Sequence, residues 1–288
     1  MFRHLFGLFP RSLVASKSSY NTAIPFPKPI IDAHRPVISS IPEYTFPILP
    51  ATSVAGALLS GKHRSFRRDA SRCLTYLRPG LRLCGAQHIP SSAPFLITVN
   101  HYSRPGFNAV WTAFAVSATV PVEIHWLITS AWTFPGRRLR RPARKISEWV
   151  LYRLSIVYGF TPLPPMPPDP LEVQARALAV KRALNYARQT PAPAIGLAPE
   201  GQDAPGGRLC VPPAGVGRFI VQLLNHCQSV VPIGIFEEGG YLCAQFGAPY
   251  TLEIPPDLHH KQLDQYVSGQ VMAAIARELP SHLRGEYE

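Results

Sequence analysis

The stretch Pro94-Phe95-Leu96-Ile97-Thr98-Val99-Asn100-His101 is the plainest strand signal in the chain and ends in two polar residues. Its short, apolar and partly β-branched run predicts a buried strand over 95–99. His101 then stands at the end of this strand, directly before the turn-rich segment 102–106. Since α/β proteins hold reactive groups at the carboxyl ends of strands and histidine is a base near neutral pH, His101 is a candidate catalytic residue. The alternative is a histidine that satisfies a turn.

A second apolar run ends in the same way. The run Ala194-Ile195-Gly196-Leu197-Ala198 leads into Pro199-Glu200-Gly201, which places a carboxylate after a strand. Parallel strands bring their carboxyl ends to one edge of a sheet. We therefore expect Glu200 and His101 to lie at the same edge.

Strand-like and helix-like segments alternate along the chain. Strands are expected over 81–89, 95–99, 123–129, 156–160, 194–198, 230–236 and 241–246, with a hairpin turn at 237–240. Helices are expected over 62–77, 107–118, 146–152, 170–189, 216–227 and about 263–275. In the clearest helix, 170–189, the expected buried stripe is Val173, Ala177, Val180, Leu184 and Ala187. The alternation predicts an α/β fold, with a mixed, mostly parallel sheet flanked by helices in a single domain.

The chain divides into three expected parts. Residues 1–60 form a Pro-rich, basic N-terminal extension, 61–80 a basic helical lead-in, and 81–288 the α/β domain. The extension begins with apolar residues at helical spacing beside basic ones: Phe2, Arg3, Leu5, Phe6, Phe9, Arg11, Leu13 and Lys17. This pattern is typical of a membrane-interface anchor or an organellar targeting segment. The alternative is an irregular N-terminal tail.

The amino-acid composition limits the classes of partner and the compartment that can be expected. The 288 residues carry a net charge of +12, which suits nucleic acid, an anionic membrane surface or a phosphorylated substrate. Five widely spaced cysteines form neither a disulfide framework nor a zinc site and fit a reducing compartment. The sequence contains neither a complete phosphate-binding glycine loop nor an apolar stretch of the roughly 18 residues that a transmembrane helix needs.

Four features follow one another in a fixed order: Asn100-His101 after a strand, Gly159-Phe160 after a helix, Pro199-Glu200-Gly201 after a strand, and Val231-Pro232-Ile233-Gly234 within a late strand. The segment Gly85-Ala86-Gln87-His88-Ile89-Pro90 precedes the first of them. In this order they resemble the glycerolipid acyltransferase superfamily, which contains bacterial 1-acylglycerol-3-phosphate acyltransferase. The resemblance covers roughly residues 81–249 and depends on the order of the motifs, since Pro-Glu-Gly alone is common in loops.

The resemblance implies an acyltransferase. A fatty acyl group would pass from a thioester donor, acyl-CoA or acyl carrier protein, to a hydroxyl of a glycerolipid-type or other lipid acceptor, with no metal or other cofactor. His101 would be the general base, because an alcohol attacks poorly until a base removes its proton. Glu200 would orient the acceptor or structure its turn. The residues expected to stabilise the oxyanion or position the acceptor are Asn100, Ser103, Asn108 and Gly201.

The sequence departs from the family pattern at three places. The family has an Asp five positions after the His, where it orients the imidazole, and here that position is Gly106. The candidate substitutes are Asp203 and Glu200, with Glu123 a weaker one. The segments 161–165 and 202–203 hold no basic residue, although the family has one in each for the acceptor phosphate. We therefore expect an acceptor less anionic than a glycerol phosphate, or one whose phosphate is held elsewhere.

A dense basic cluster adjoins aromatic residues. It consists of Arg137, Arg138, Arg140, Arg141, Arg144 and Lys145, with Trp132, Phe134 and Trp149 on either side. Basic and aromatic side chains together suit an anionic lipid surface, at about 1 kcal/mol per charge near the headgroups. We therefore expect a peripheral membrane protein at a cytoplasmic face, with a solvated loop between core aromatics as the alternative.

Two other functions compete with acyl transfer. A lipid-binding protein that keeps this fold but has lost catalysis would explain Gly106. A nucleic-acid-binding protein would explain the charge. The sequence carries no recognisable nucleic-acid-binding motif, so nucleic acid is not an expected partner.

Overall fold

The molecule is built on a central sheet. The structure, a computed structural model, describes residues 41–132 and 140–288. The strands in these residues are β1 (Arg82–Cys84), β2 (Phe95–Val99), β3 (His125–Thr129), β4 (Thr161–Leu163), β5 (Ala194–Leu197), β6 (Val230–Glu238) and β7 (Tyr241–Phe246). They form a seven-stranded sheet in the order β1-β7-β6-β2-β5-β3-β4. Every neighbouring pair is parallel except β6 and β7, which confirms the predicted mixed, mostly parallel sheet.

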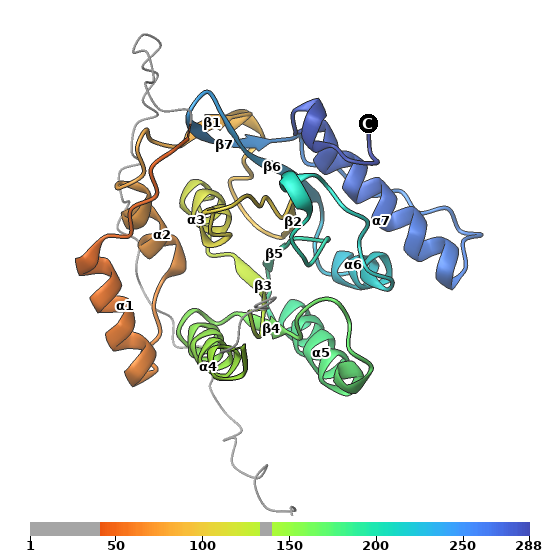
Figure 1. The fold of residues 1–288 in the computed structure, drawn as a ribbon. Coiled ribbons are helices and arrows are strands. Elements are labelled where there is room, and N and C mark those ends of the chain that lie inside the picture. The colour runs from red at the N-terminus through yellow and green to blue at the C-terminus, as the bar shows by residue number, and fades with distance from the viewer. Residues whose placement is uncertain (1–40, 133–139) are drawn as a thin grey trace, which may run out of the picture. The chain divides into compact units, whose positions relative to one another are not determined.

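Helices flank the sheet on both sides. They are α1 (Ile48–Ser60), α2 (Phe66–Leu74), α3 (Val110–Thr119), α4 (Arg140–Tyr158), α5 (Val173–Gln189), α6 (Val216–Leu224) and α7 (His260–Arg277). Helices α1 to α4 lie on one side of the sheet and α5 to α7 on the other (Figure 1). The predicted α/β class is therefore confirmed. Within the described ranges, no helix combines the length and the apolar character that crossing a membrane requires.

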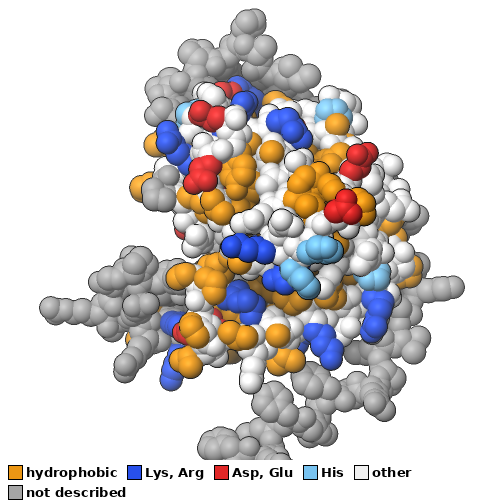
Figure 2. Space-filling view, turned by 90° about the vertical axis from the view of Figure 1, so that its right-hand side faces the viewer, with side chains coloured by type: hydrophobic (Ala, Val, Ile, Leu, Met, Phe, Trp, Pro, Cys, Tyr) orange, Lys and Arg blue, Asp and Glu red, His pale blue; other side chains and the backbone are white. Residues whose placement is uncertain are grey.

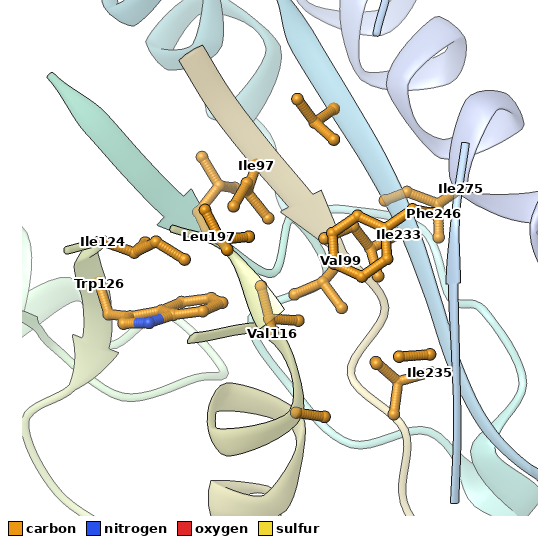
Figure 3. Packing of buried hydrophobic residues seen from close by; sticks show 14 of the residues in the cluster. Ile97, Val99, Val116, Ile124, Trp126, Leu197, Ile233, Ile235, Phe246 and Ile275 are labelled. Atoms are coloured by element: carbon orange, nitrogen blue, oxygen red, sulfur yellow. The ribbon is translucent and has the colours of Figure 1, made fainter. Parts of the chain in front are cut away.

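Strand β2 lies inside the sheet and is buried along its whole length. All five of its side chains are buried, because β5 and β6 flank it and helices cover both faces. Val116 of helix α3 faces Val99 of β2 and Leu197 of β5 (Figure 3). Fully burying one such side chain contributes about 1.5–3 kcal/mol. This core fixes the point at which β2 ends, and with it the position of His101.

The structure corrects the predictions at α4 and at α5. Residues 156–158, predicted as strand, belong to helix α4, because a short apolar run does not distinguish the two structures. This helix ends before Gly159, whose φ of 72° suits a helix C-terminus. The buried residues of α5 are Ala179, Ala183 and Ala187; of the predicted stripe only Ala187 is buried, and Val173 and Ala177 are exposed. The alanine face has the small side chains that let this helix pack closely.

The segments before β1 contain two helices. Helix α1 lies at the end of the predicted N-terminal extension, where the sequence analysis names no helix. Helix α2 lies in the predicted lead-in, and its residues Phe66, Ala70 and Cys73 belong to the main hydrophobic core. The predicted N-terminal amphipathic stretch lies outside the described residues. The three-part division of the chain stays a prediction.

The hairpin between β6 and β7 is tighter than the sequence predicts. Glu237 and Glu238 are strand residues paired with β7, so the turn consists of Gly239 and Gly240 alone. Both glycines have positive φ, 56° and 80°, as a two-residue hairpin turn requires. Glu237 is therefore held on a strand rather than in a loop.

Candidate active site

The carboxyl ends of β2 and β5 lie side by side (Figure 1). Asn100, which directly follows β2, binds Ile235 of β6 twice. Its Nδ2 donates to the Ile235 carbonyl oxygen at 2.8 Å, and the Ile235 N–H donates to its Oδ1 at 2.7 Å. The buried side chain thus continues the pairing of β2 with β6 and fixes the start of the loop that carries His101. The amide predicted to position the acceptor is engaged with backbone.

His101 lies beside Asp203 and forms an ion pair with it when the imidazole is protonated. Its Nδ1 lies 2.7 Å from Oδ1 of Asp203, although the carboxylate stands off the axis of a well-aligned hydrogen bond. The His101 side chain is 27% exposed and that of Asp203 is 64% exposed, so solvent reaches both. A carboxylate beside Nδ1 favours the tautomer with hydrogen on that nitrogen, which leaves Nε2 as the basic nitrogen. The structure thus brings together the candidate base and a candidate substitute for the missing acid.

Burial and charge shift the pKa values of these groups in opposite directions. Burial lowers the pKa of His101, but the carboxylates of Asp203 and Glu200 outweigh it, so the pKa lies above its ordinary value. The close contact with His101 holds the pKa of Asp203 below its usual range, and the Ser103 hydroxyl adds to this effect. Burial raises the pKa of Glu200 despite its backbone hydrogen bonds. The neutral imidazole that a base requires therefore predominates only at a pH above the ordinary pKa of histidine.

Glu200 holds two loops together. Its Oε2 accepts from the His101 N–H at 2.6 Å, and its Oε1 accepts from the Cys210 N–H at 2.9 Å. The residue is 1% exposed. Because backbone amides occupy both oxygens, these contacts favour the structuring role of Glu200 over direct contact with an acceptor.

Removal of the Glu200 carboxylate should destabilise the protein. We expect Glu200→Ala to lower the free energy of unfolding by about 2 kcal/mol, because two backbone N–H groups lose a charged acceptor. Urea denaturation followed by circular dichroism measures this change. The control is Glu253→Ala, at an exposed carboxylate, which should stay within about 0.5 kcal/mol of wild type. Unchanged stability of Glu200→Ala would assign the carboxylate to the acceptor instead.

Glycines allow the loops after β2 and β5 to approach closely. Gly207 has a φ of 70°, and a Cβ there would lie 2.9 Å from the Ser103 carbonyl oxygen. Gly201, with a φ of 65°, donates its N–H to the Ala198 carbonyl oxygen at 3.1 Å and reverses the chain. Together they bring the two side chains of the ion pair into contact. The N–H of Gly201, predicted to stabilise an oxyanion, is engaged in its own turn.

Three further residues of the sequence analysis have clear positions. Asn108 is exposed, and its Oδ1 accepts from the Val110 N–H at 3.0 Å, where helix α3 begins. Gly106 has a φ of 83°, a left-handed conformation that favours glycine over an acid. Glu123 precedes β3, at the opposite edge of the sheet, and accepts a hydrogen bond from the Ser65 hydroxyl. It therefore does not lie beside His101.

The predicted basic cluster lies only partly within the described residues. Arg137 and Arg138 fall outside them, and Arg140 and Arg141 begin helix α4. Arg144 binds Glu148 at 2.8 Å and Glu172 at 3.0 Å, which neutralises part of its charge, whereas Lys145 is exposed. On the side formed by α5 to α7, basic side chains and histidines are spread among hydrophobic patches (Figure 2).

A polar cluster beside His101 is missed by the sequence analysis. The Arg104 guanidinium donates to both oxygens of Glu237, at 2.5 and 2.7 Å. The hydroxyls of Tyr44 and Tyr102 donate to the same carboxylate, at 2.5 and 3.2 Å. An Arg three positions after His101 is visible in the sequence. Its partner is 133 positions away, so no local pattern pairs the two.

The site can perform proton transfer. It holds an accessible imidazole with a carboxylate on one nitrogen, at the carboxyl edge of an α/β sheet. This is the arrangement of a general base that is oriented by an acid. Within residues 41–132 and 140–288, no group of three or more His, Cys, Asp or Glu side chains is placed to bind a metal ion.

Comparisons with known proteins find a similarity at the level of structure. The chain has no significant match to a family model or to a curated protein sequence. It is similar to the crystal structure of the 1-acyl-sn-glycerophosphate (LPA) acyltransferase PlsC from Thermotoga maritima, with a TM-score of 0.45 and 14% sequence identity. The similarity covers 79% of this chain and 82% of that chain. That protein is of the kind that the sequence motifs resemble, but a similarity of this size assigns no activity.

Proposed function

We propose that the protein transfers a fatty acyl group from a thioester, acyl-CoA or acyl carrier protein, to a hydroxyl of a lipid acceptor. The observation that carries the proposal is the 2.7 Å contact between Nδ1 of His101 and Oδ1 of Asp203. It gives the candidate base the negatively charged partner that Gly106, at the position of the family's Asp, cannot supply. The order of the sequence motifs supplies the reaction class, and the ion pair supplies the base with its acid.

In the proposed reaction, Nε2 of His101 carries the proton. It accepts the proton of the acceptor hydroxyl while the oxygen attacks the thioester carbonyl carbon. Asp203 stabilises the resulting imidazolium, as the acid of a serine protease triad does. Backbone N–H groups of the loop after His101 would stabilise the oxyanion of the tetrahedral intermediate. The C–S bond then breaks, and the imidazolium returns the proton to the leaving thiolate, which yields an ester and a free thiol.

The competing proposal is a lipid-binding protein without catalysis. Binding a lipid requires apolar surface and does not require a carboxylate on one nitrogen of an accessible imidazole. The ion pair of His101 with Asp203 therefore favours the enzyme over the binding protein.

Charges beside His101 favour an uncharged acceptor. Asp203 and Glu200 place two carboxylates at the base, and Arg104 of the same loop is neutralised by Glu237. A phosphate dianion close to these carboxylates would be repelled. We therefore propose an acceptor lipid without charge near the reacting hydroxyl, such as a monoacylglycerol.

Thioester turnover tests the activity and the acceptor. Free thiol released from acyl-CoA is measured with monoacylglycerol, with lysophosphatidic acid and without an acceptor. We expect acceptor-dependent release with monoacylglycerol, and at least about 10-fold less with lysophosphatidic acid because of charge repulsion. Efficient acylation of lysophosphatidic acid would contradict the uncharged acceptor. Lipid binding without acceptor-dependent release would favour the lipid-binding alternative.

We propose that the protein works on an anionic membrane surface. Large apolar side chains are exposed on helix α4 and shortly before it, namely Trp132, Ile146, Trp149 and Tyr152. Lys145 lies among them and is exposed. Aromatic and aliphatic side chains beside cations suit the interface of an anionic bilayer.

Co-sedimentation of the full chain with vesicles tests the membrane proposal. We expect binding to phosphatidylglycerol vesicles that weakens at high salt, because the cations are then screened. Trp149→Ala should lower the bound fraction, whereas Val211→Ala, at an exposed apolar residue elsewhere, should not. Equal binding to uncharged vesicles, or no effect of Trp149→Ala, would contradict the proposal.

A further inference from the structure

Glu237 joins three segments of the chain beside the candidate base. Its carboxylate accepts four hydrogen bonds, two from Arg104 and one each from the hydroxyls of Tyr44 and Tyr102. A carboxylate offers about four lone-pair sites, so all of them are used. The Glu237 side chain is 9% exposed and that of Arg104 is 20% exposed. These four residues are called the Glu237 cluster below.

The Glu237 cluster holds the loop that follows His101. Tyr102 and Arg104 stand on either side of Ser103, whose hydroxyl helps to lower the pKa of Asp203. Before them, Asn100 is tied to β6 through the backbone of Ile235, two residues from Glu237 on the same strand. Residues 100–104 are therefore attached to β6 at both ends, with the base between the two attachments.

The side chains of the Glu237 cluster are suited to holding a position rather than exchanging protons. The charges of one guanidinium and one carboxylate cancel. Burial, followed by the charge of Glu237, raises the pKa of Tyr102 to about 12. Burial and the hydrogen bond to Glu237 also raise the pKa of Tyr44. Both hydroxyls therefore stay protonated donors at any pH at which the protein works.

We infer that Glu237 is a positioning residue of the candidate site: through Arg104 and Tyr102 it holds the loop so that His101 meets Asp203. This inference rests on the proposed acyl transfer. An acid five positions after the base would belong to the same loop. Here the acid follows β5 and the base follows β2, so the two segments must be held relative to each other. A misplacement of about 1 Å can lower a rate by about 100-fold.

Tyr44 gives the Glu237 cluster a support outside the sheet. It lies in the segment before α1, and its ring packs against Phe107 and Trp111 at centroid distances of 5.4 and 5.2 Å. The same tyrosine thus contacts both the carboxylate of Glu237 and an aromatic ring of the loop. Loss of its hydroxyl alone removes one of the four hydrogen bonds and leaves the packing in place.

The test compares Glu237→Gln with Glu238→Gln. The second change has the same chemistry at the next residue, which is exposed. For Glu237→Gln we expect kcat to fall by at least about 10-fold, with a thioester KM within about 2-fold of wild type. Glu238→Gln should match wild type in both. If the role of Glu237 is purely structural, Glu237→Gln has a lower melting temperature but keeps the wild-type kcat at temperatures at which it is folded.

A second readout does not need enzyme activity. The titration of the His101 imidazole is followed by NMR in the full chain. Movement of the loop away from Asp203 lowers the midpoint, whereas Glu237 itself is not among the charges that shift the pKa of His101. We expect a lower midpoint in Glu237→Gln and an unchanged one in Glu238→Gln.

The outcomes separate this inference from the proposed function. Without acyl transfer in the wild type, the titration alone decides, and a lower midpoint in Glu237→Gln supports the positioning role. A folded Glu237→Gln protein with wild-type kcat and an unchanged midpoint overturns it. If Glu237→Gln does not fold, Tyr44→Phe takes its place. A folded Tyr44→Phe protein with neither value changed then overturns the inference.

Discussion

Acyl transfer by the His101→Ala variant is expected to be slower than that of the wild type by about 10²- to 10⁴-fold in kcat. The variant keeps the site but lacks the group that takes the proton from the acceptor hydroxyl. The side chain is 27% exposed and its ion-pair partner is largely in solvent, so we expect the fold to tolerate the truncation. The His101 N–H, which binds Glu200, is retained because it belongs to the backbone.

The measurement is acceptor-dependent thiol release at saturating donor, with hydrolysis subtracted. The matched control is His226→Ala, which alters a histidine between α6 and β6, in a groove that Pro94 and Pro191 also line just before β2 and β5. His226→Ala should leave kcat unchanged. Equal activity of wild type and His101→Ala would remove His101 from the mechanism and, with it, the proposed role of the ion pair.

The Asp203→Asn variant is expected to show two linked changes. At high pH its kcat/KM is lower than that of the wild type by about 10²-fold. The loss is smaller than the roughly 10⁴-fold found when the acid of a serine protease is neutralised, because Asp203 is exposed and its charge is screened. The rise of kcat/KM with pH also moves to lower pH. The carboxylate of Asp203 helps to raise the pKa of His101, and without it the effect of burial, which lowers that pKa, is opposed mainly by Glu200.

The pH profile of kcat/KM checks the sign of this effect, because it reports the ionisation of the free enzyme. A base works in its neutral form, so the wild-type profile should rise through a midpoint above about 6.5, the ordinary value for histidine. The control is Asp257→Asn, at an exposed carboxylate, which should match wild type. If kcat/KM of Asp203→Asn reaches the wild-type value at high pH, or if the midpoint of its pH profile moves to higher pH, Asp203 is not the partner of the base.

Much of the fold follows from local patterns. The apolar runs at β2 and β5 lie where the sequence predicts strands, because a short apolar run with β-branched residues, bounded by turn signals, suits a strand inside a covered sheet. The convergence of His101 and Glu200 follows from the same patterns, since both residues stand at carboxyl ends of parallel strands. The predictions fail where a short apolar run fits two structures, as at residues 156–158.

The details of the site are less predictable. Asp203 could be named only as one of several carboxylates, because nothing local indicates which acid reaches the imidazole. The choice depends on the left-handed turn at Gly201 and on the close approach at Gly207. Glu237 is read in the sequence as part of a hairpin turn, whereas the two-glycine turn places it on β6.

Local sequence was therefore sufficient for the α/β class, for most strands and helices and for the edge at which His101 stands. Each of these depends on the periodicity and ends of one segment. The acid beside His101, the structuring contacts of Glu200 and the Glu237 cluster depend on tertiary structure. Apart from the contact of Glu200 with Cys210, they join residues 99 to 193 positions apart, and such contacts are set by strand order and by the packing of loops. The sequence of a single segment does not indicate which distant residues it contacts.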